Sequence, residues 1–302
     1  MSTSPDLPLC EASRPPLTLV IGADGFIGRH LAAAYRRWYP EAKVTTKSGG
    51  GPGRLALDLG TPDIDAARLA GEGYRYAVIA AGVTGLAACE TAPEETRRVN
   101  VDGTLKLAGC LSRAGIIPIW FSTDYVFDGI NGNYDETCKP DPLNEYGRQK
   151  CEVEKALYHA CNGRYLIIRL SKIFDLDARS NTLLNEMVDR LQSEGDIYAA
   201  VDQVFSPTLI DDVVQLLFQL QLLGCNGLFH ISSPEVWTRF ELARLIARTI
   251  QADPCLIHPI SLDDLSESFV RPKKTNLISR YHHLKQSQDF TPMRSCLVHY
   301  RP

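Results

Sequence analysis

The feature that most constrains the fold of this chain is a short apolar run. Spaced glycines and then a helical pattern follow it. The run LTLVIG at 17–22 is typical of a strand buried on both faces. The segment after it repeats apolar residues with helical spacing, so three glycines fall in the strand-to-helix turn and the first helical turn. Backbone N–H groups there can approach a pyrophosphate at the positive end of a helix. We predict dinucleotide-binding positions at Gly22, Gly25, Phe26, Ile27 and Gly28, with a plain tight turn as the alternative because the glycine spacing is one residue off the common fingerprint.

Strands and helices are expected to alternate after this turn. Strand patterns occur at 43–46, 54–59, 76–82 and 116–123, and helical patterns near 63–71 and 92–114. This alternation predicts an α/β fold with a doubly wound parallel sheet and helices on both faces. Because ligands of such sheets bind beyond the carboxyl ends of the strands, the candidate positions are Asp58, Ala80, Ala81, Gly82 and Thr123.

The second half has a looser pattern. A buried strand is expected at 164–171, a helix at 181–193, a short strand at 197–201 and an extended loop at 202–208. A helix entered at 211–212, a strand at 227–232, a helix at 238–250 and a basic, irregular end follow. We predict a flexible tail at 1–16, a nucleotide-binding domain at 17–170, and a smaller, mainly substrate-binding lobe at 171–302 that returns some elements to the sheet.

Composition excludes several classes of function. The 302 residues carry a net charge of −4, which gives no signal for nucleic acid or a membrane surface. The later apolar runs are too short or carry acids, so no membrane span is expected. Nine cysteines without a C-x-x-C pair indicate reduced thiols and a cytoplasmic protein. The histidines have no metal-binding spacing, and we propose no metal.

A tyrosine and a lysine four residues apart supply a candidate for proton transfer. Tyr146 and Lys150 fall at the start of a helical pattern, so they share one helix face. An ammonium beside a phenol lowers a phenol pKa that is otherwise ~10. The pair is weak evidence by itself, and its meaning depends on whether the chain also binds a hydride donor.

The loop after the second strand bears on the choice of cofactor. An acid about 20 residues beyond the glycines usually meets a free ribose 2′-hydroxyl. Here no acid occurs between Glu41 and Asp58, whereas Lys47 and Arg54 could hold a 2′-phosphate. We predict NADPH, with NADH as the alternative cofactor and a solvated basic loop as the alternative role of these two residues.

Seven sequence blocks together carry a family resemblance. They are GADGFIG, AAGVTG (80–85), VNVDGT (99–104), FSTDYVFDG (121–129), PLNEYGRQK (142–150), DQVFSPT (202–208) and RPKKTNL (271–277). From about residue 17 onward the chain resembles the extended short-chain dehydrogenases/reductases, and most of all the dTDP-4-dehydrorhamnose reductases. The resemblance implies a Rossmann-type nucleotide domain with a C-terminal substrate-binding lobe.

The resemblance also implies roles for individual residues. Thr123 would hydrogen-bond the substrate carbonyl, Tyr146 would donate the proton, and Lys150 would hold the nicotinamide ribose. Asn100 would support the site from a neighbouring helix, or else act as a helix N-cap. Asp58 and Leu59 would border the adenine, unless Asp58 only caps the following turn. The substrate positions are Thr84, Asp124, Tyr125, Lys172, Asn181, Gln203 and Arg271.

Two positions bear on the substrate. In the related sugar-nucleotide 4,6-dehydratases an Asp-Glu pair follows the threonine, but here Tyr125 follows Asp124, which favours simple ketone reduction. The rhamnose-type reductases usually carry Trp at the position of Lys172, where it can pack on the sugar. Lys172 could instead pair with an acid or a phosphate, or face solvent without a role.

The function implied is NADPH-dependent reduction of the 4-keto group of a nucleotide-linked 6-deoxy sugar, by a protein that could form a homodimer. One alternative is a protein like the regulatory subunit of methionine adenosyltransferase, which shares these blocks yet acts by binding a partner enzyme. The other is an epimerase or reductase of the same superfamily that acts on a different ketone.

Overall fold

A computed structural model describes residues 14–177, 179–281 and 290–300. Its centre is a seven-stranded sheet in the order β11-β6-β5-β4-β1-β2-β3, with every neighbouring pair parallel. This confirms the predicted doubly wound α/β fold. The strands are β1 (Thr18–Ile21), β2 (Val44–Thr46), β3 (Arg54–Ala56), β4 (Tyr76–Ile79), β5 (Ile117–Thr123), β6 (Leu166–Leu170) and β11 (Gly227–Ile231).

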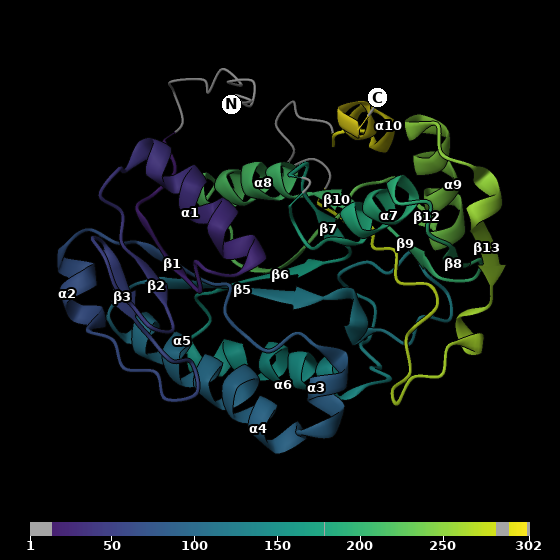
Figure 1. Cartoon of the computed structure of the whole chain (residues 1–302). Coiled ribbons are helices and arrows are strands. Elements are labelled where there is room, and N and C mark those ends of the chain that lie inside the picture. Colours follow the sequence, from purple (N-terminus) through teal and green to yellow (C-terminus); the bar gives the residue numbers. More distant parts are fainter. Residues whose placement is uncertain (1–13, 178, 282–289, 301–302) are drawn as a thin grey trace.

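Helices cover both faces of the sheet (Figure 1). On one face lie α1 (Phe26–Trp38) and α8 (Ile210–Leu222), and on the other lie α2 (Ala66–Gly71), α5 (Thr104–Arg113) and α6 (Glu145–Ala160). Each face has its own apolar core. Because the central strands are buried on both faces, their sequences read as continuous apolar runs. No helix of the described ranges is long and apolar enough to cross a bilayer.

The helical pattern at 92–114 is not one helix, which corrects that expectation. The chain forms α3 (Leu86–Thr91), α4 (Pro93–Arg97), a π-helical segment (Arg98–Gly103) and α5. Pro93 lacks an N–H and therefore starts a new helix. At Gly103 an added Cβ would lie 1.7 Å from the Leu59 carbonyl oxygen, so the wider π segment packs directly against the chain after β3.

A third core lies beside the carboxyl ends of the strands (Figure 1). It is built from α7 (Leu183–Gln192), β8 (Ile197–Ala200), α9 (Arg239–Ile250), β13 (Ile257–Ile260) and α10 (Met293–Leu297). Strand β13 was not expected. It exists by pairing in parallel with β8, a contact between distant segments. The end of the chain was expected to be irregular, but α10 shows that part of it is helical.

The loop 202–208 is extended, as expected, but it also contains two short strands. β9 (Val204–Phe205) pairs with β12 (Trp237–Thr238), and β10 (Thr208–Leu209) pairs with β7 (Ile173–Phe174). Residues 1–13 of the predicted tail lie outside the described residues. At its end, the Arg14 guanidinium donates to the Trp38 carbonyl, and the Tyr39 hydroxyl donates to the Pro15 carbonyl. These contacts attach residues 14 and 15 to the end of α1.

Candidate functional site

The glycine turn after β1 has the backbone that the sequence pattern requires. Gly22 has φ +87°, and the N–H groups of Gly22 and Ala23 both donate to the Thr45 carbonyl. A Cβ on Gly28 would lie 2.0 Å from the Gly22 carbonyl oxygen, so only glycine fits there. Helix α1 begins at Phe26 without a side-chain cap and without an acid in its first turn. Its open N–H groups suit the pyrophosphate of a dinucleotide.

The basic residues predicted near the ribose both face carboxylates. Lys47 Nζ lies 3.3 Å from Asp58 Oδ2, and Arg54 Nη1 lies 3.5 Å from Asp24 Oδ1. Asp58 also accepts from the Gly60 N–H, which is the turn-capping role considered as its alternative. The Gly60 N–H and then Lys47 lower the pKa of Asp58. A 2′-phosphate would therefore compete with exposed carboxylates for these two cations.

The predicted positions after β3 and β4 lie against the glycine turn and the π segment. Leu59 is buried in the core on the α5 face, so its side chain is directed away from the site. Ala81 closes against Gly22, where an added Cβ would lie 2.8 Å from the Ala81 nitrogen. Ala80 and Gly82 flank Ala81 at the end of β4.

Asn100 fastens the loop that leads into the site. Its Oδ1 accepts from the Val83 N–H at 2.7 Å, and its Nδ2 donates to the Val83 carbonyl at 2.9 Å and to Gln149 Oε1 at 2.8 Å. The π segment has no side-chain cap, so Asn100 is not the N-cap considered as its alternative. Instead it links α6 to the residues directly before Thr84.

The three predicted catalytic residues come from β5 and α6. Thr123 ends β5, and Tyr146 and Lys150 lie on the first turns of α6, which Asn144 caps by accepting from the Gly147 N–H. The Lys150 ammonium donates to the Phe121 carbonyl at 2.7 Å and lies 4.3 Å over the Trp120 ring and 5.7 Å over the Tyr146 ring. The lysine is therefore fixed beneath the strand end and the tyrosine.

The pKa values of this pair differ from the sequence-based expectation. Burial, and then the Asp124 carboxylate, raise the pKa of Tyr146, while the Thr123 hydroxyl acts in the opposite direction. Burial also lowers the pKa of Lys150 to about 8. The net pKa of Tyr146 is thus raised in the protein alone, whereas the sequence predicted that Lys150 would lower it. The reason is that the ammonium faces the ring and a backbone carbonyl, and burial dominates.

One pocket of about 620 Å³ brings most of the predicted reactive and substrate residues together. From the predicted set it is lined by Thr84, Thr123, Asp124, Tyr125, Tyr146, Lys172 and Arg271. Its wall also contains Ser171, Glu267 and Phe269, which the sequence did not single out. Glu267 and Arg271 are four residues apart and form an ion pair, a spacing that could have drawn attention to Glu267.

Asp124 and Lys172 are neighbours on the wall of this pocket. Asp124 is 3% exposed and accepts from the Thr123 hydroxyl at 3.1 Å and the Ser171 hydroxyl at 2.9 Å. Burial raises the pKa of Asp124, and the Lys172 charge opposes this. The Lys172 ammonium lies 5.0 Å over the Tyr125 ring. Lys172 is therefore part of the pocket wall and is not a remote, solvent-facing residue.

Two predicted substrate residues do not line this pocket. Asn181 is exposed just before α7. Gln203 is 4% exposed, and its Oε1 has no hydrogen-bond partner among the described residues. Their assignments remain predictions.

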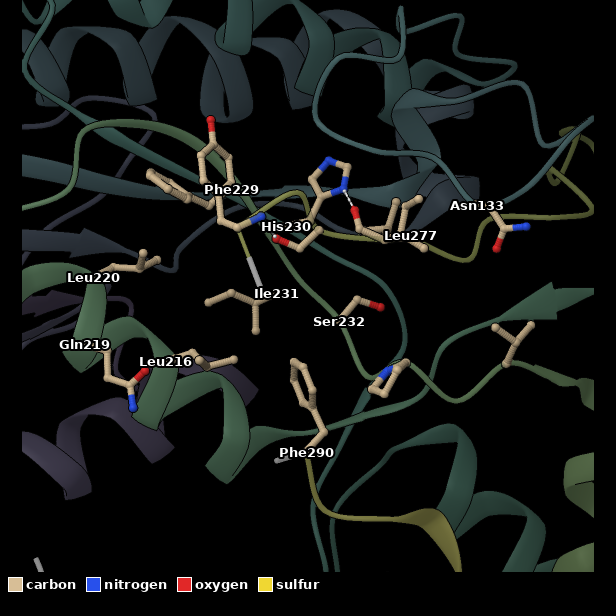
Figure 2. Close-up of a pocket in the computed structure, with 15 residues that line it drawn as sticks. Asn133, Leu216, Gln219, Leu220, Phe229, His230, Ile231, Ser232, Leu277 and Phe290 are labelled. Carbon is tan, nitrogen blue, oxygen red and sulfur yellow. Dashed lines mark hydrogen bonds between the residues drawn. The ribbon is translucent and has the colours of Figure 1, made fainter. Parts of the chain in front are cut away.

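A second, smaller pocket of about 140 Å³ contains none of the predicted site residues (Figure 2). Leu216 and Leu220 of α8 and Phe229 and Ile231 of β11 form one part of its apolar wall. At its edge the His230 Nδ1–H donates to the Ile278 carbonyl at 2.9 Å. Within the described ranges no cluster of three or more His, Cys, Asp or Glu side chains could hold a metal ion.

Comparison with known proteins relates the chain to sugar-nucleotide reductases. The family model described as RmlD substrate binding domain matches residues 17–300. A dTDP-4-keto-6-deoxy-D-glucose reductase of Streptomyces niveus is 28% identical over 279 residues, which cover 91% of this chain and 92% of that protein. The methionine adenosyltransferase 2 subunit beta of Danio rerio is 28% identical over 293 residues, which cover 92% and 88%.

Solved structures have the same fold. A dTDP-4-dehydrorhamnose reductase from Bacillus anthracis, in complex with NADP, superposes with a TM-score of 0.81 at 22% identity and covers 95% of this chain and 98% of its own. A hypothetical dTDP-4-dehydrorhamnose reductase from Sulfolobus tokodaii gives a TM-score of 0.76 at 27% identity, with 92% and 98% covered.

Proposed function

The chain belongs to the RmlD substrate binding domain family, and on this premise we propose that it reduces the 4-keto group of a nucleotide-linked 6-deoxy sugar with NADPH. The observation that carries the proposal is that Thr123 and Tyr146 line the same pocket while Lys150 lies beneath them. The reductases among its relatives support the same substrate class.

The side chains of the pocket suit ketone reduction. NADPH, held at the glycine turn, would supply the hydride. Negative charge then builds on the carbonyl oxygen, and the Tyr146 phenol gives its proton to that oxygen while the Thr123 hydroxyl hydrogen-bonds it. With Tyr125 in the place of a second acid, Asp124 has no carboxylate beside it in sequence for a proton transfer at a neighbouring carbon.

The preference for NADPH rests on the loop after β2. Lys47 and Arg54 bring two cations to the end of the glycine turn, and the NADP complex of a structural neighbour is consistent with such a role. Michaelis constants for NADPH and NADH test the preference. We expect a lower value for NADPH, and a loss of the difference in Lys47→Ala with Arg54→Ala. A lower value for NADH in the unchanged protein would contradict the preference.

The direct test is NADPH oxidation with a panel of 4-keto nucleotide sugars. We expect turnover of at least one member, and a fall of about 10²–10⁴ in kcat for Tyr146→Phe, because the proton donor is lost. Tyr158→Phe is the matched control, since Tyr158 lies exposed on the same helix. No turnover with any ketone despite tight NADPH binding would reject the reductase proposal.

A second candidate function is partner binding without turnover. The near full-length match to methionine adenosyltransferase 2 subunit beta favours it, because that protein is a subunit of another enzyme. Co-purification with a methionine adenosyltransferase catalytic subunit, and stimulation of that subunit, would support it. If neither occurs and a ketone is reduced, this candidate is rejected. Product analysis that finds an inverted carbon without net NADPH oxidation would favour an epimerase.

We also propose that the protein acts in the cytoplasm. The eight cysteines of the described residues are all free thiols, which supports a reducing compartment. A homodimer is proposed only as an expectation, which the mass in solution would test.

A further inference from the structure

Three distant segments meet at the lobe side of the reactive pocket. Strand β9 pairs with β12 on one side, and on the other the Val204 N–H donates to the Lys273 carbonyl and the Thr275 N–H donates to the Val204 carbonyl. The start of α9 is fixed to the same strand, because the Arg239 N–H donates to the Gln203 carbonyl at 3.0 Å. This arrangement places Arg239 and Arg271 on either side of β9.

Arg239 is in an unfavourable position for a cation. It is the first residue of the twelve-residue helix α9, where the helix dipole is positive. Its Nε is buried and has no hydrogen-bond partner in the described part of the chain. Burial, and then the neighbouring Arg271 guanidinium, lower the pKa of Arg239. A buried donor without an acceptor destabilises a fold, and more so when it belongs to a charged group.

The nearby carboxylates do not neutralise this pair of guanidiniums. Glu267 is bound to Arg271, to which it is four residues N-terminal. Glu186 and Glu267 favour the charge on Arg239, but neither forms an ion pair with it in the described residues. Glu241, in the first turn of α9, is already used in the capping box with Thr238. In the described residues Arg271 therefore has a directly bound carboxylate and Arg239 has none.

Arg239 does not itself line the pocket already described, but its charge interacts with residues that do. Arg239 interacts electrostatically with Tyr125, Glu267 and Arg271, and all three line the wall that also carries Thr123 and Tyr146. A planar guanidinium pair matches the geometry of phosphate oxygens and can bind them through paired hydrogen bonds. An anionic group held there would satisfy the buried Nε and screen the repulsion between the two arginines.

We propose that Arg239 is a specificity-determining residue that binds, together with Arg271, the diphosphate of the nucleotide-linked substrate. The inference rests on the proposed function for the identity of the substrate. It adds that the diphosphate is recognised by a cation at the first position of α9, and that the protein loses stability by keeping this cation there without an anion.

Arg239→Gln tests the proposal because it should weaken the binding of dTDP and, at the same time, raise the melting temperature of the unliganded protein. The protein is first saturated with NADP⁺, so that a nucleoside diphosphate cannot occupy the cofactor's own pyrophosphate site. We expect the Kd for dTDP, measured by calorimetry, to rise by about 10- to 100-fold, as for the loss of charged hydrogen bonds. We also expect the unliganded variant to melt at a higher temperature than the unchanged protein, because a frustrated buried charge is removed.

The matched control is Arg244→Gln, which removes an exposed arginine from the same helix. It should change neither the Kd nor the melting temperature. Thymidine, which has no phosphate, should distinguish recognition of the nucleoside from recognition of the diphosphate, since its binding should be equal in both variants. Inorganic pyrophosphate should reproduce the difference between the unchanged protein and Arg239→Gln.

Two results would overturn the proposal. One is dTDP binding by Arg239→Gln that equals that of the unchanged protein. The other is a lower melting temperature with unaltered phosphate binding, which would give Arg239 a purely structural role. Because dTDP binding needs no ketone reduction, these results are separable from a failure of the reductase proposal, which would appear as tight dTDP binding without turnover of any keto sugar.

Discussion

Lys150 is an ammonium in a position that disfavours its charge. It lies beneath β5 with one backbone carbonyl and an aromatic ring as its neighbours, and burial lowers its pKa to about 8. The unfolded chain would have a Lys pKa of ~10.4. The folded protein therefore binds fewer protons than the unfolded chain between these two values. The protonated lysine therefore destabilises the fold, because its ammonium is buried beneath the reactive pocket.

This difference predicts a specific pH dependence of stability. Below pH 8 both states are protonated, and the cost of the ammonium is present in full, at about 3 kcal/mol by the size of the shift. As pH rises from about 8 to ~10.4 that cost is relieved, because the unfolded chain still binds the proton. We expect Lys150→Met to be the more stable protein at pH 7, and its advantage to narrow across this window. Urea unfolding of both proteins at a series of pH values measures the difference in their free energies of unfolding. A difference that stays constant with pH would contradict the lowered pKa of Lys150.

Asp124 shows why neighbouring residues in sequence can have different environments. Thr123, Asp124 and Tyr125 are consecutive, yet Asp124 accepts hydrogen bonds from the Thr123 and Ser171 hydroxyls while the Tyr125 ring packs against Tyr146 and Lys172. The residue types predicted a polar reactive site. Only the fold determines that one Asp124 carboxylate oxygen accepts from the Thr123 hydroxyl and the other from the Ser171 hydroxyl.

Among the elements, the turn from β1 to α1 depends most strictly on its residues. Gly22 adopts a positive φ, and Gly28 leaves room for the Gly22 carbonyl. The open N–H groups of α1 lie at the end of this turn. The backbone path of the turn therefore also determines whether an anion can bind there. A side chain at Gly28 would have to displace backbone.

We therefore expect Gly28→Ala to impair both stability and cofactor binding. The added methyl group would overpack the turn, at a cost of about 1–3 kcal/mol, and displace the first turn of α1. Gly71→Ala is the control, because a Cβ at this helical glycine meets nothing within 4 Å and should stabilise by about 0.5–1 kcal/mol. Thermal unfolding and NADPH titration measure both effects. Unaltered NADPH binding by Gly28→Ala would show that the turn tolerates the change.

At the scale of the whole molecule, a buried carboxylate joins α1 to the segment before α7. Asp175 Oδ2 lies 3.1 Å from Arg29 Nη2 and 2.8 Å from His30 Nε2, both on α1. The same carboxylate accepts from the Ser180 hydroxyl, in the segment that leads to α7. The side chain of Asp175 is 4% exposed. The helix that follows the glycine turn is thus fastened directly to the segment that leads to α7.

Asp175→Ala should loosen this connection. Loss of the charged hydrogen bonds is expected to lower the free energy of unfolding by about 1.5–3 kcal/mol. It should also raise the Michaelis constants for NADPH and for the sugar together, because the two sides are no longer held in one arrangement. Asp177→Ala is the control, since Asp177 is exposed and its carboxylate forms an ion pair with the nearby Arg179. A change in stability without any change in either constant would limit Asp175 to a structural role.

Much of the fold was predictable because its signals are local. Central strands buried on both faces are continuous apolar runs, and the glycine spacing marks the first turn, so both could be read directly. The π segment and β13 could not. They depend on the approach of Leu59 to Gly103 and on the pairing of β13 with β8, and no local pattern records such contacts.

The sequence by itself determined the alternation of the central strands and helices, the glycine turn and the residue types that can transfer a proton. These depend on hydrophobic periodicity and on side-chain chemistry, which are properties of the chain alone. Only the tertiary structure decided that Lys150 would lie under Trp120 and Tyr146 and lose proton affinity, and that Arg239 would meet Arg271 across β9. The burial of charged groups and the distances between them are fixed only when distant segments pack. Both determine the strength of each electrostatic interaction.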